Sequence, residues 1–475
     1  MNRTGFLAAG VLTLAVAAFA QESTLRQEKV TLTVQQAVDY ALENSRTLKS
    51  AQIDLEMKDR AAKYGWNILL PSMSVSGTMR RANEYNPGNG ATFGLISELH
   101  PEANIRVPTG YDGEEDRWST IGNVSLGWNF SAAMVQQIRA SKLAFETGKI
   151  TWEQSQIDTT VQIRKLFYAL LLQQESLKIQ QTTLENSRQR ATQAQTNFRN
   201  GNVPEISYLQ AEVAYQNLIP DVEQAEREIA RSFDTFAFLL GFPVGTEVEL
   251  VGEIAPTYID ANSDDLLARY GGNNLDIQSL QSNIEQLKLN LSALDLATWT
   301  PALAVNFALN PAYAGSKGAW HFFGDLGKDE KWYDSGTLSF TLAWNITNML
   351  PWSANRQQAA DVRANLTKLE LTMETLRENQ KMEVRKAVDT LNQAREQIDA
   401  MGRNVTLAQR AYEMSARSYR NGTTELLDLR DAENSLNQAK LGQLNQQYNY
   451  ICALMDLEKS LNVVLSEPQQ AAGQN

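Results

Sequence analysis

The sequence predicts a mainly α-helical fold with a small membrane β part, built from two copies of one unit. The first observation is a seven-residue apolar repeat that occurs twice and each time runs into an Arg-Asn-Gly turn. The first stretch carries Ile163, Leu170, Leu177, Leu184, Ala191 and Phe198, and the second carries Val384, Leu391, Ile398, Val405, Tyr412 and Tyr419. The second observation is a pair of alternating apolar and polar runs before each stretch. Together they predict duplicated long helical hairpins, each preceded by two strands.

The start of the chain has the pattern of a secretory signal. Arg3 precedes an apolar run, and Ala18-Phe19-Ala20 is a small-x-small cleavage site before Gln21, so we expect residues 1–20 to be removed on export. The chain has one cysteine and two histidines. An intrachain disulfide and a His/Cys metal cluster are therefore excluded, and the net charge of −12 argues against a nucleic-acid partner.

The mature chain divides into a first repeat over residues 21–250, a second over 251–465 and a polar tail over 466–475. Each repeat is expected to begin with a helix that ends before a proline. The first is predicted over 33–65, before Pro71, and the second over 264–298, before Pro301.

Two strands are predicted after each of these helices, near 72–81 and 118–130 and near 301–310 and 336–346. Large apolar residues alternate with small or polar ones, as in Val124, Leu126, Trp128 and Phe130. This pattern is typical of a membrane β-barrel, although a strand that covers a soluble core has the same alternation. Long polar connections over 82–117 and 311–335 favour the barrel, because they suit its extracellular loops.

A very long helix is predicted after each strand pair, over 134–199 and 353–420, and each helix would span ~100 Å. Returning helices are predicted over 204–240 and 424–461, and Pro220 is expected to kink or break the first of them. Four strands cannot close a barrel, and an open sheet edge in lipid leaves backbone groups unpaired. Three copies would supply twelve strands and would also give the heptad helices partners.

The turn of the second hairpin carries the most specific motif, Tyr419-Arg420-Asn421-Gly422 followed by Asp428-Leu429-Arg430-Asp431-Ala432. It resembles the periplasmic tip of the TolC family of outer-membrane efflux proteins, and the resemblance covers essentially all of the mature chain. It implies a homotrimer in outer-membrane lipid, with a twelve-stranded β-barrel above an α-barrel tunnel. It also implies a periplasmic adaptor (membrane fusion protein) that links the trimer to an inner-membrane RND, ABC or MFS transporter.

The candidate gate lies at the tips. Asp428 and Asp431 are three residues apart at the start of a helix, so both carboxylates share one face. In a trimer each aspartate becomes a ring of three charges that favours cations. The structural alternative is that the two carboxylates only stabilise the start of the helix through the helix dipole. The Tyr419 hydroxyl can form a hydrogen bond to a neighbouring hairpin, with Ser207 as its candidate partner. The alternative is that Tyr419 has only a packing role. The best-known family member has Arg at the position of Thr424 and Asp at that of Ser207, and these groups help to latch its gate.

The two tip turns are the candidate adaptor-docking sites, and this role rests on the resemblance. They consist of Arg199, Asn200 and Gly201 in the first copy and Arg420, Asn421 and Gly422 in the second. Both glycines are expected to adopt positive φ, because this conformation commonly ends a helix.

No enzyme, cofactor or resident metal is indicated, because neither a phosphate-binding glycine loop nor a nucleophile elbow occurs in the sequence. The leading hypothesis is an export duct gated at its periplasmic tip, for small molecules or secreted proteins. One alternative is a structural or adhesive coiled-coil protein of the envelope without a pore, which would not need strand pairs with long loops. A periplasmic adaptor is a third possibility, but it usually has a single hairpin.

Overall fold

The fold was analysed in a computed structural model that describes residues 30–81, 118–243, 245–313, 332–334, 336–421 and 423–465. The expected signal over 1–20, the loop over 82–117, most of the loop over 311–335, Gly422 and the tail over 466–475 lie outside the described residues. The chain forms two compact units. One comprises Met1–Glu56, Thr147–Gln281 and Leu371–Asn475, and the other comprises Met57–Glu146 and Ser282–Glu370.

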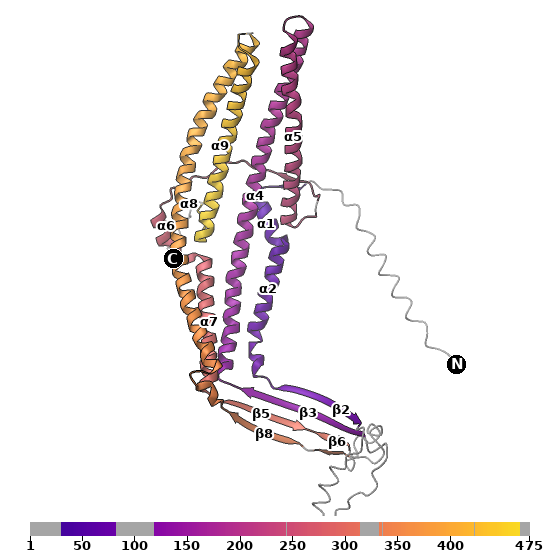
Figure 1. The fold of residues 1–475 in the computed structure, drawn as a ribbon, viewed down its shortest axis with the longest axis vertical. Coiled ribbons are helices and arrows are strands. Elements are labelled where there is room, and N and C mark those ends of the chain that lie inside the picture. Colours follow the sequence, from indigo (N-terminus) through magenta and orange to yellow (C-terminus); the bar gives the residue numbers. More distant parts are fainter. Residues whose placement is uncertain are drawn as a thin grey trace, which may run out of the picture. The chain divides into compact units, whose positions relative to one another are not determined.

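The duplication is reproduced in the bounds of the four longest helices. These are α4 (Ala133–Arg199) and α5 (Glu205–Leu240) in the first copy, and α8 (Ala354–Arg420) and α9 (Leu426–Leu461) in the second. Each bound in the second copy is 221 residues beyond its counterpart, for example Arg420 against Arg199. Within the first unit, α4 lies beside α5 and α8 beside α9 as two helical hairpins (Figure 1). The predicted fold class is confirmed.

The shorter helices differ from the prediction at two places. The helix expected over 33–65 is divided at Ser45 into α1 (Val34–Asn44) and α2 (Arg46–Lys63). The helix expected over 264–298 is divided into α6 (Ser263–Tyr270), a 3-10 turn η4 (Gly271–Asn273) and α7 (Leu275–Trp299). The second break has a local cause: the side chain of Asn274 accepts a bond from the Ile277 amide and so caps the start of α7.

Pro220 does not break α5, which runs continuously through it. A proline inside a helix removes one backbone bond and costs about 3 kcal/mol, so packing has to offset that loss. Val222 and Ala211 are buried on either side of Pro220, and Phe236 and Leu240 are completely buried further along α5. The expected break was wrong because the proline penalty was judged without this tertiary packing, and the alternative expectation of a kink at Pro220 stays a prediction.

Each repeat has its own hydrophobic core at equivalent positions. The first core surrounds Ile163, Leu170, Phe236 and Leu240, and the second surrounds Val384, Leu391, Leu457 and Leu461. The members of the second set are each 221 residues beyond those of the first, so the heptad positions near the middle of α4 and α8 are buried in both copies. Two short strands, β1 (Val30–Leu32) and β4 (Val248–Leu250), pair in parallel and contribute to the first core. Neither short strand was predicted.

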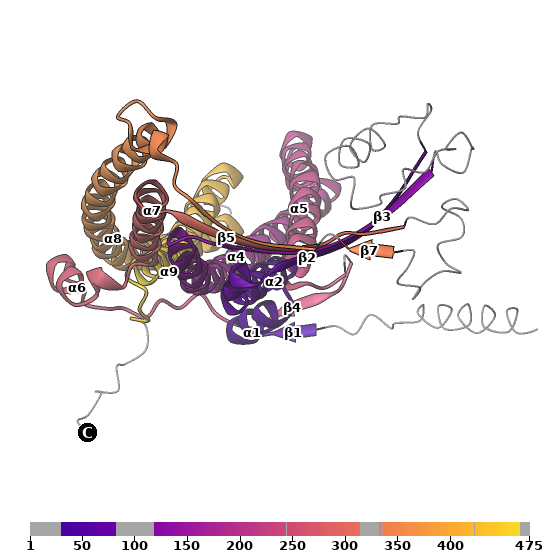
Figure 2. The same ribbon diagram turned by 90° about the horizontal axis from the view of Figure 1, so that it is seen from below.

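The strands of the second unit form one antiparallel sheet in the order β2-β3-β5-β8, seen edge-on as a thin curved layer in Figure 2. Their bounds are β2 (Ser72–Arg81), β3 (Trp118–Phe130), β5 (Ala302–Leu309) and β8 (Thr337–Ala343). Short strands β6 (Pro311–Tyr313) and β7 (Trp332–Asp334) extend the pairing beyond Asn310. The expected loop over 311–335 therefore begins with strand, because β6 still pairs with β3.

The strand expected near 336–346 is shorter than predicted. β8 ends at Ala343, and Ile346 begins the 3-10 turn η6 (Ile346–Met349), so alternation alone placed the strand end too late. No helix in the described part of the chain combines the length and apolar character needed to cross a membrane.

Candidate functional site at the hairpin tips

The two hairpin tips are closed by the same backbone hydrogen bond at equivalent positions. In the first tip the amide of Asn202 donates to the carbonyl of Asn197 at 2.8 Å, and in the second the amide of Thr423 donates to that of Ser418 at 3.0 Å. A bond that spans five residues at a helix end is the mark of a Schellman cap. Gly201 sits inside the first cap with a φ of 75°, as expected. The duplication thus extends to the chemistry of the turns.

The predicted gate residues lie close to these turns. Asp428 and Asp431 occupy the first two turns of α9 and are both exposed. Tyr419 and Ser207 are half-buried near the ends of their helices. Within the described residues of a single chain, Tyr419 and Ser207 do not bond to each other, so the pairing stays a prediction for contacts between copies.

A small apolar cluster joins the start of α9 to the first hairpin. Ala191, Ala194 and Ala211 are buried there, and Leu426 of the second copy packs against them together with Tyr208 and Tyr215. The ring of Tyr208 stacks on Phe198, with centroids 6.0 Å apart. The two tips of one chain are therefore in direct contact.

A buried charge pair lies beside this cluster and was not predicted. The guanidinium of Arg190 on α4 donates to the carboxylate of Glu433 on α9 at 2.6 Å, with side-chain exposures of 14% and 4%. The other carboxylate oxygen of Glu433 accepts from the Asn186 amide at 2.9 Å. The Glu433 charge therefore has a charged and a neutral partner on α4, which is the arrangement a buried carboxylate needs.

Two neighbours complete this polar cluster. The Asn437 amide donates to the Thr183 hydroxyl at 2.9 Å, one turn further from the tips. Tyr412 on α8 lies close enough for its pKa to be affected: burial raises the pKa of the phenol, the Glu433 charge raises it further and Arg190 lowers it. We call Thr183, Asn186, Arg190, Glu433 and Asn437 the α4–α9 lock. In the sequence, Ala432-Glu433 aligns with Ala211-Glu212 of the first copy. This alignment singles out Glu433, but it does not identify Arg190 as its partner.

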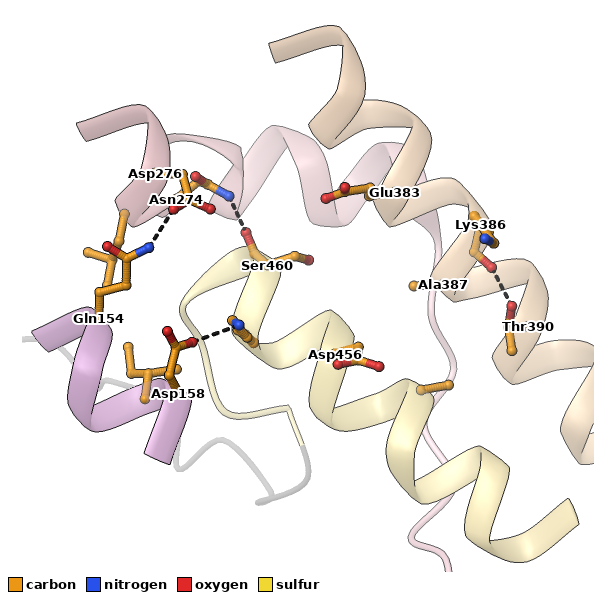
Figure 3. Close-up of a pocket in the computed structure, with 14 residues that line it drawn as sticks. Gln154, Asp158, Asn274, Asp276, Glu383, Lys386, Ala387, Thr390, Asp456 and Ser460 are labelled. Atoms are coloured by element: carbon orange, nitrogen blue, oxygen red, sulfur yellow. Dashed lines mark hydrogen bonds and ion pairs between the residues drawn. The ribbon is translucent and has the colours of Figure 1, made fainter. Parts of the chain in front are cut away.

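A second polar region lies further along α4 and α9, around a cavity of about 480 Å³. Figure 3 shows its walls, in which the Lys459 ammonium pairs with Asp158 at 2.7 Å and the Asn274 amide donates to the Ser460 carbonyl at 3.0 Å. Most of the charged groups drawn there are exposed. In the described part of the chain, no three His, Cys, Asp or Glu side chains are grouped so that they could hold a metal ion.

Comparison with known proteins identifies the class. A family model described as outer membrane efflux protein matches residues 37–241 and 270–463. A nodulation protein T of Rhizobium leguminosarum bv. trifolii is 21% identical over 351 residues, which is 71% of each chain. The CmeC outer membrane channel of Campylobacter jejuni superposes with a TM-score of 0.70 at 17% identity, over 90% of this chain and 85% of that one. The outer membrane protein VceC of Vibrio cholerae superposes with a TM-score of 0.66 at 14% identity, over 90% of this chain and 96% of that one.

The chain belongs to the outer membrane efflux protein family. It is accordingly a protein of the outer membrane and a channel component, not an enzyme.

Proposed function

We propose that three copies of this chain form an export duct, with a twelve-stranded barrel in the outer membrane and an α-helical tunnel in the periplasm. The observation that carries the proposal is the pair of open sheet edges. Among the described strands, β2 pairs only with β3 and β8 only with β5, so each has a free side. Unpaired backbone groups in lipid cost several kcal/mol each, so these edges need partners.

The side chains on the edge strands agree with this arrangement. Met73 and Val75 on β2 are 69% and 70% exposed, and Phe340 and Leu342 on β8 are 69% and 71% exposed. Apolar side chains this exposed at alternate positions suit contact with lipid. Joining β8 of one copy to β2 of the next would satisfy both backbone edges, and three copies would close the ring.

The duct is passive and depends on partners for energy. We assign the tip turns, Arg199 to Gly201 and Arg420 to Gly422, to docking of a periplasmic adaptor, which would connect the duct to an inner-membrane RND, ABC or MFS transporter. Open space supports this role in the first turn, since a Cβ placed on Gly201 would have no neighbour within 4 Å. The cargo would be a small molecule or a secreted protein.

The gate would be formed by Asp428 and Asp431, with Tyr419 and Ser207 as candidate contacts between copies. Two carboxylates ~8 Å apart repel by roughly 2 kcal/mol at an effective dielectric of ~20. Three-membered rings of such charges would attract cations into a closed tip and exclude anions. The α4–α9 lock would hold the two tips of each chain together.

Two measurements test the proposal. Light scattering of the purified protein in detergent should give three chains per particle, and planar bilayers should show discrete conductance steps. A stable monomer that carries no current would contradict the duct and would favour the coiled-coil envelope protein without a pore.

A further inference from the structure

The duplication is broken at the connection between the sheet and each long helix. In the first copy, residues 131–132 join β3 to α4, whereas in the second copy residues 344–353 join β8 to α8. Because α4 and α8 begin at equivalent positions, the longer connection belongs to the second copy alone. We call residues 344–353 the β8–α8 connection.

The β8–α8 connection exposes large apolar side chains in a fixed conformation. Ile346 and Trp352 are 65% and 72% exposed. The backbone that carries them is held by the 3-10 turn η6 and by the Ser353 hydroxyl, which donates to the Asn348 carbonyl at 2.8 Å. Large apolar side chains gathered on a surface and held in this way indicate contact with a partner.

The partner follows from where this surface lies. Phe340 and Leu342 are on the exposed apolar face of β8 that we propose to contact lipid, and Trp344 and Ile346 continue the same alternation beyond the end of the strand. The apolar face therefore runs without interruption from the sheet into the β8–α8 connection. Lipid is the occupant that this continuity favours.

A cation lies beside the connection. Arg356 is half-buried at the start of α8, where α7 and α8 meet the sheet (Figure 1). Its guanidinium carbon lies 5.9 Å from the centroid of the Trp299 ring, which is itself exposed. Within the described part of the chain Arg356 forms no ion pair, and its equivalent in the first copy is Val135. A half-buried guanidinium without a carboxylate can accept an anionic group from outside the chain.

The helical segments of the same unit are basic, although the protein as a whole is acidic. Residues 57–63, 133–146, 282–299 and 354–370 carry nine Lys or Arg and six Asp or Glu, a net charge of +3. The net charge of the whole chain is −12. Basic side chains beside a membrane attract anionic headgroups, so the charge favours an anionic phospholipid over a zwitterionic one.

We propose that Arg356 and Trp299 bind the phosphate of an anionic phospholipid in the periplasmic leaflet of the outer membrane. The acyl chains of this lipid would contact Trp344, Ile346 and Trp352. Each copy has one such site, in its second repeat. The inference rests on the proposed barrel, which places this end of the sheet in that leaflet.

Native mass spectrometry of the detergent-purified protein tests the site, because it counts chains and bound lipids together. The probe is an equal mixture of palmitoyl-oleoyl phosphatidylglycerol and palmitoyl-oleoyl phosphatidylcholine. Wild type should retain one phosphatidylglycerol per chain in preference to phosphatidylcholine. Arg356→Gln should lower this preference about fivefold, the effect of one basic side chain at an anionic surface, and Arg356→Lys should keep most of it.

Arg139→Gln is the matched control, since it removes the same charge from α4 in the same unit. It should leave the preference nearly unchanged, and an equal loss in both variants would overturn the site at Arg356. A trimer without any lipid preference overturns this inference alone. A monomer that still retains phosphatidylglycerol counts against the trimer and supports the site, and a monomer without preference overturns both.

A spin label distinguishes lipid from a second copy as the occupant of the connection. In a Cys452→Ser background, a nitroxide is attached to Trp352→Cys and the protein is placed in vesicles of the same two lipids. Contact with lipid predicts strong relaxation by oxygen and weak relaxation by a water-soluble nickel chelate. A label that is immobilised and shielded from both would show that a second copy covers this surface and would overturn the lipid contact.

Discussion

Removing Arg190 is the perturbation whose effect follows most directly from the structure. Arg190→Ala leaves the Glu433 carboxylate, whose side chain is 4% exposed, without its charged partner. Asn186 still donates to one oxygen, but a neutral amide does not replace the lost guanidinium. The result is a buried charge that is only partly compensated, at the point where the two hairpins of one chain meet.

The expected cost is about 3–5 kcal/mol, the usual range when one member of a buried ion pair is removed. Since every 1.4 kcal/mol is tenfold in an equilibrium constant, even the lower limit favours local opening of the tips by more than about a hundredfold. Arg188 provides a matched control on the same helix. Its pair with Glu185 spans 3.0 Å, but the two side chains are 61% and 47% exposed, so water screens the pair and Arg188→Ala should leave the stability of the tips nearly unchanged.

Hydrogen exchange measured by mass spectrometry on the detergent-solubilised protein reports this local opening. Exchange at the start of α9 should accelerate strongly in Arg190→Ala and hardly at all in Arg188→Ala. Arg190→Met with Glu433→Leu should recover slow exchange, because an apolar pair leaves no buried charge. Equal exchange in the two single variants would show that the pair does not hold the tips together, and the reasoning from burial would be wrong.

Three further predictions concern the tips and the single cysteine. Asp428→Ala with Asp431→Ala should abolish preference for cations and block by multivalent cations in planar bilayers; unchanged selectivity would contradict the proposed gate. Gly201→Ala should destabilise the first tip by about 1–2 kcal/mol, because a φ of 75° is strained for alanine, and should speed its proteolysis. Burial raises the pKa of the Cys452 thiol, while the Tyr448 hydroxyl lowers it through a hydrogen bond. The thiolate is the nucleophile, so iodoacetamide should react slowly at pH 8 and faster as pH rises; Tyr448→Phe should raise the pKa further and slow the reaction.

Each of the last two predictions has a control. Gly272→Ala adds a methyl group where a Cβ has no neighbour within 4 Å and φ is not positive, so it should leave proteolysis unchanged. Similar proteolysis of the Gly201 and Gly272 variants would argue against backbone strain at the tip. For Cys452, the denatured protein gives the rate of an unperturbed thiol, and faster alkylation in Tyr448→Phe than in wild type would contradict the assigned hydrogen bond.

The sequence predicted the long helices accurately because their signals are local and repeated. A seven-residue period follows from helix geometry, and two copies of it reinforce each other. The breaks at Ser45 and near Asn274 were missed because the helical pattern continues on both sides, and a single capping residue is a weak signal. β1 and β4 were missed because three residues are too few to show alternation.

For the candidate site, the sequence by itself determined the turns, the aspartates beside them and the side of each helix that is apolar. It could not determine which helix that side contacts, and Arg190 and Glu433 show why. They are 243 positions apart in the sequence. Taken separately, each is indistinguishable from a charged residue on the solvent-exposed face of a helix. Periodicity comes from the backbone of one segment, whereas the partner of a buried charge depends on how distant segments pack, so only the tertiary structure decided it.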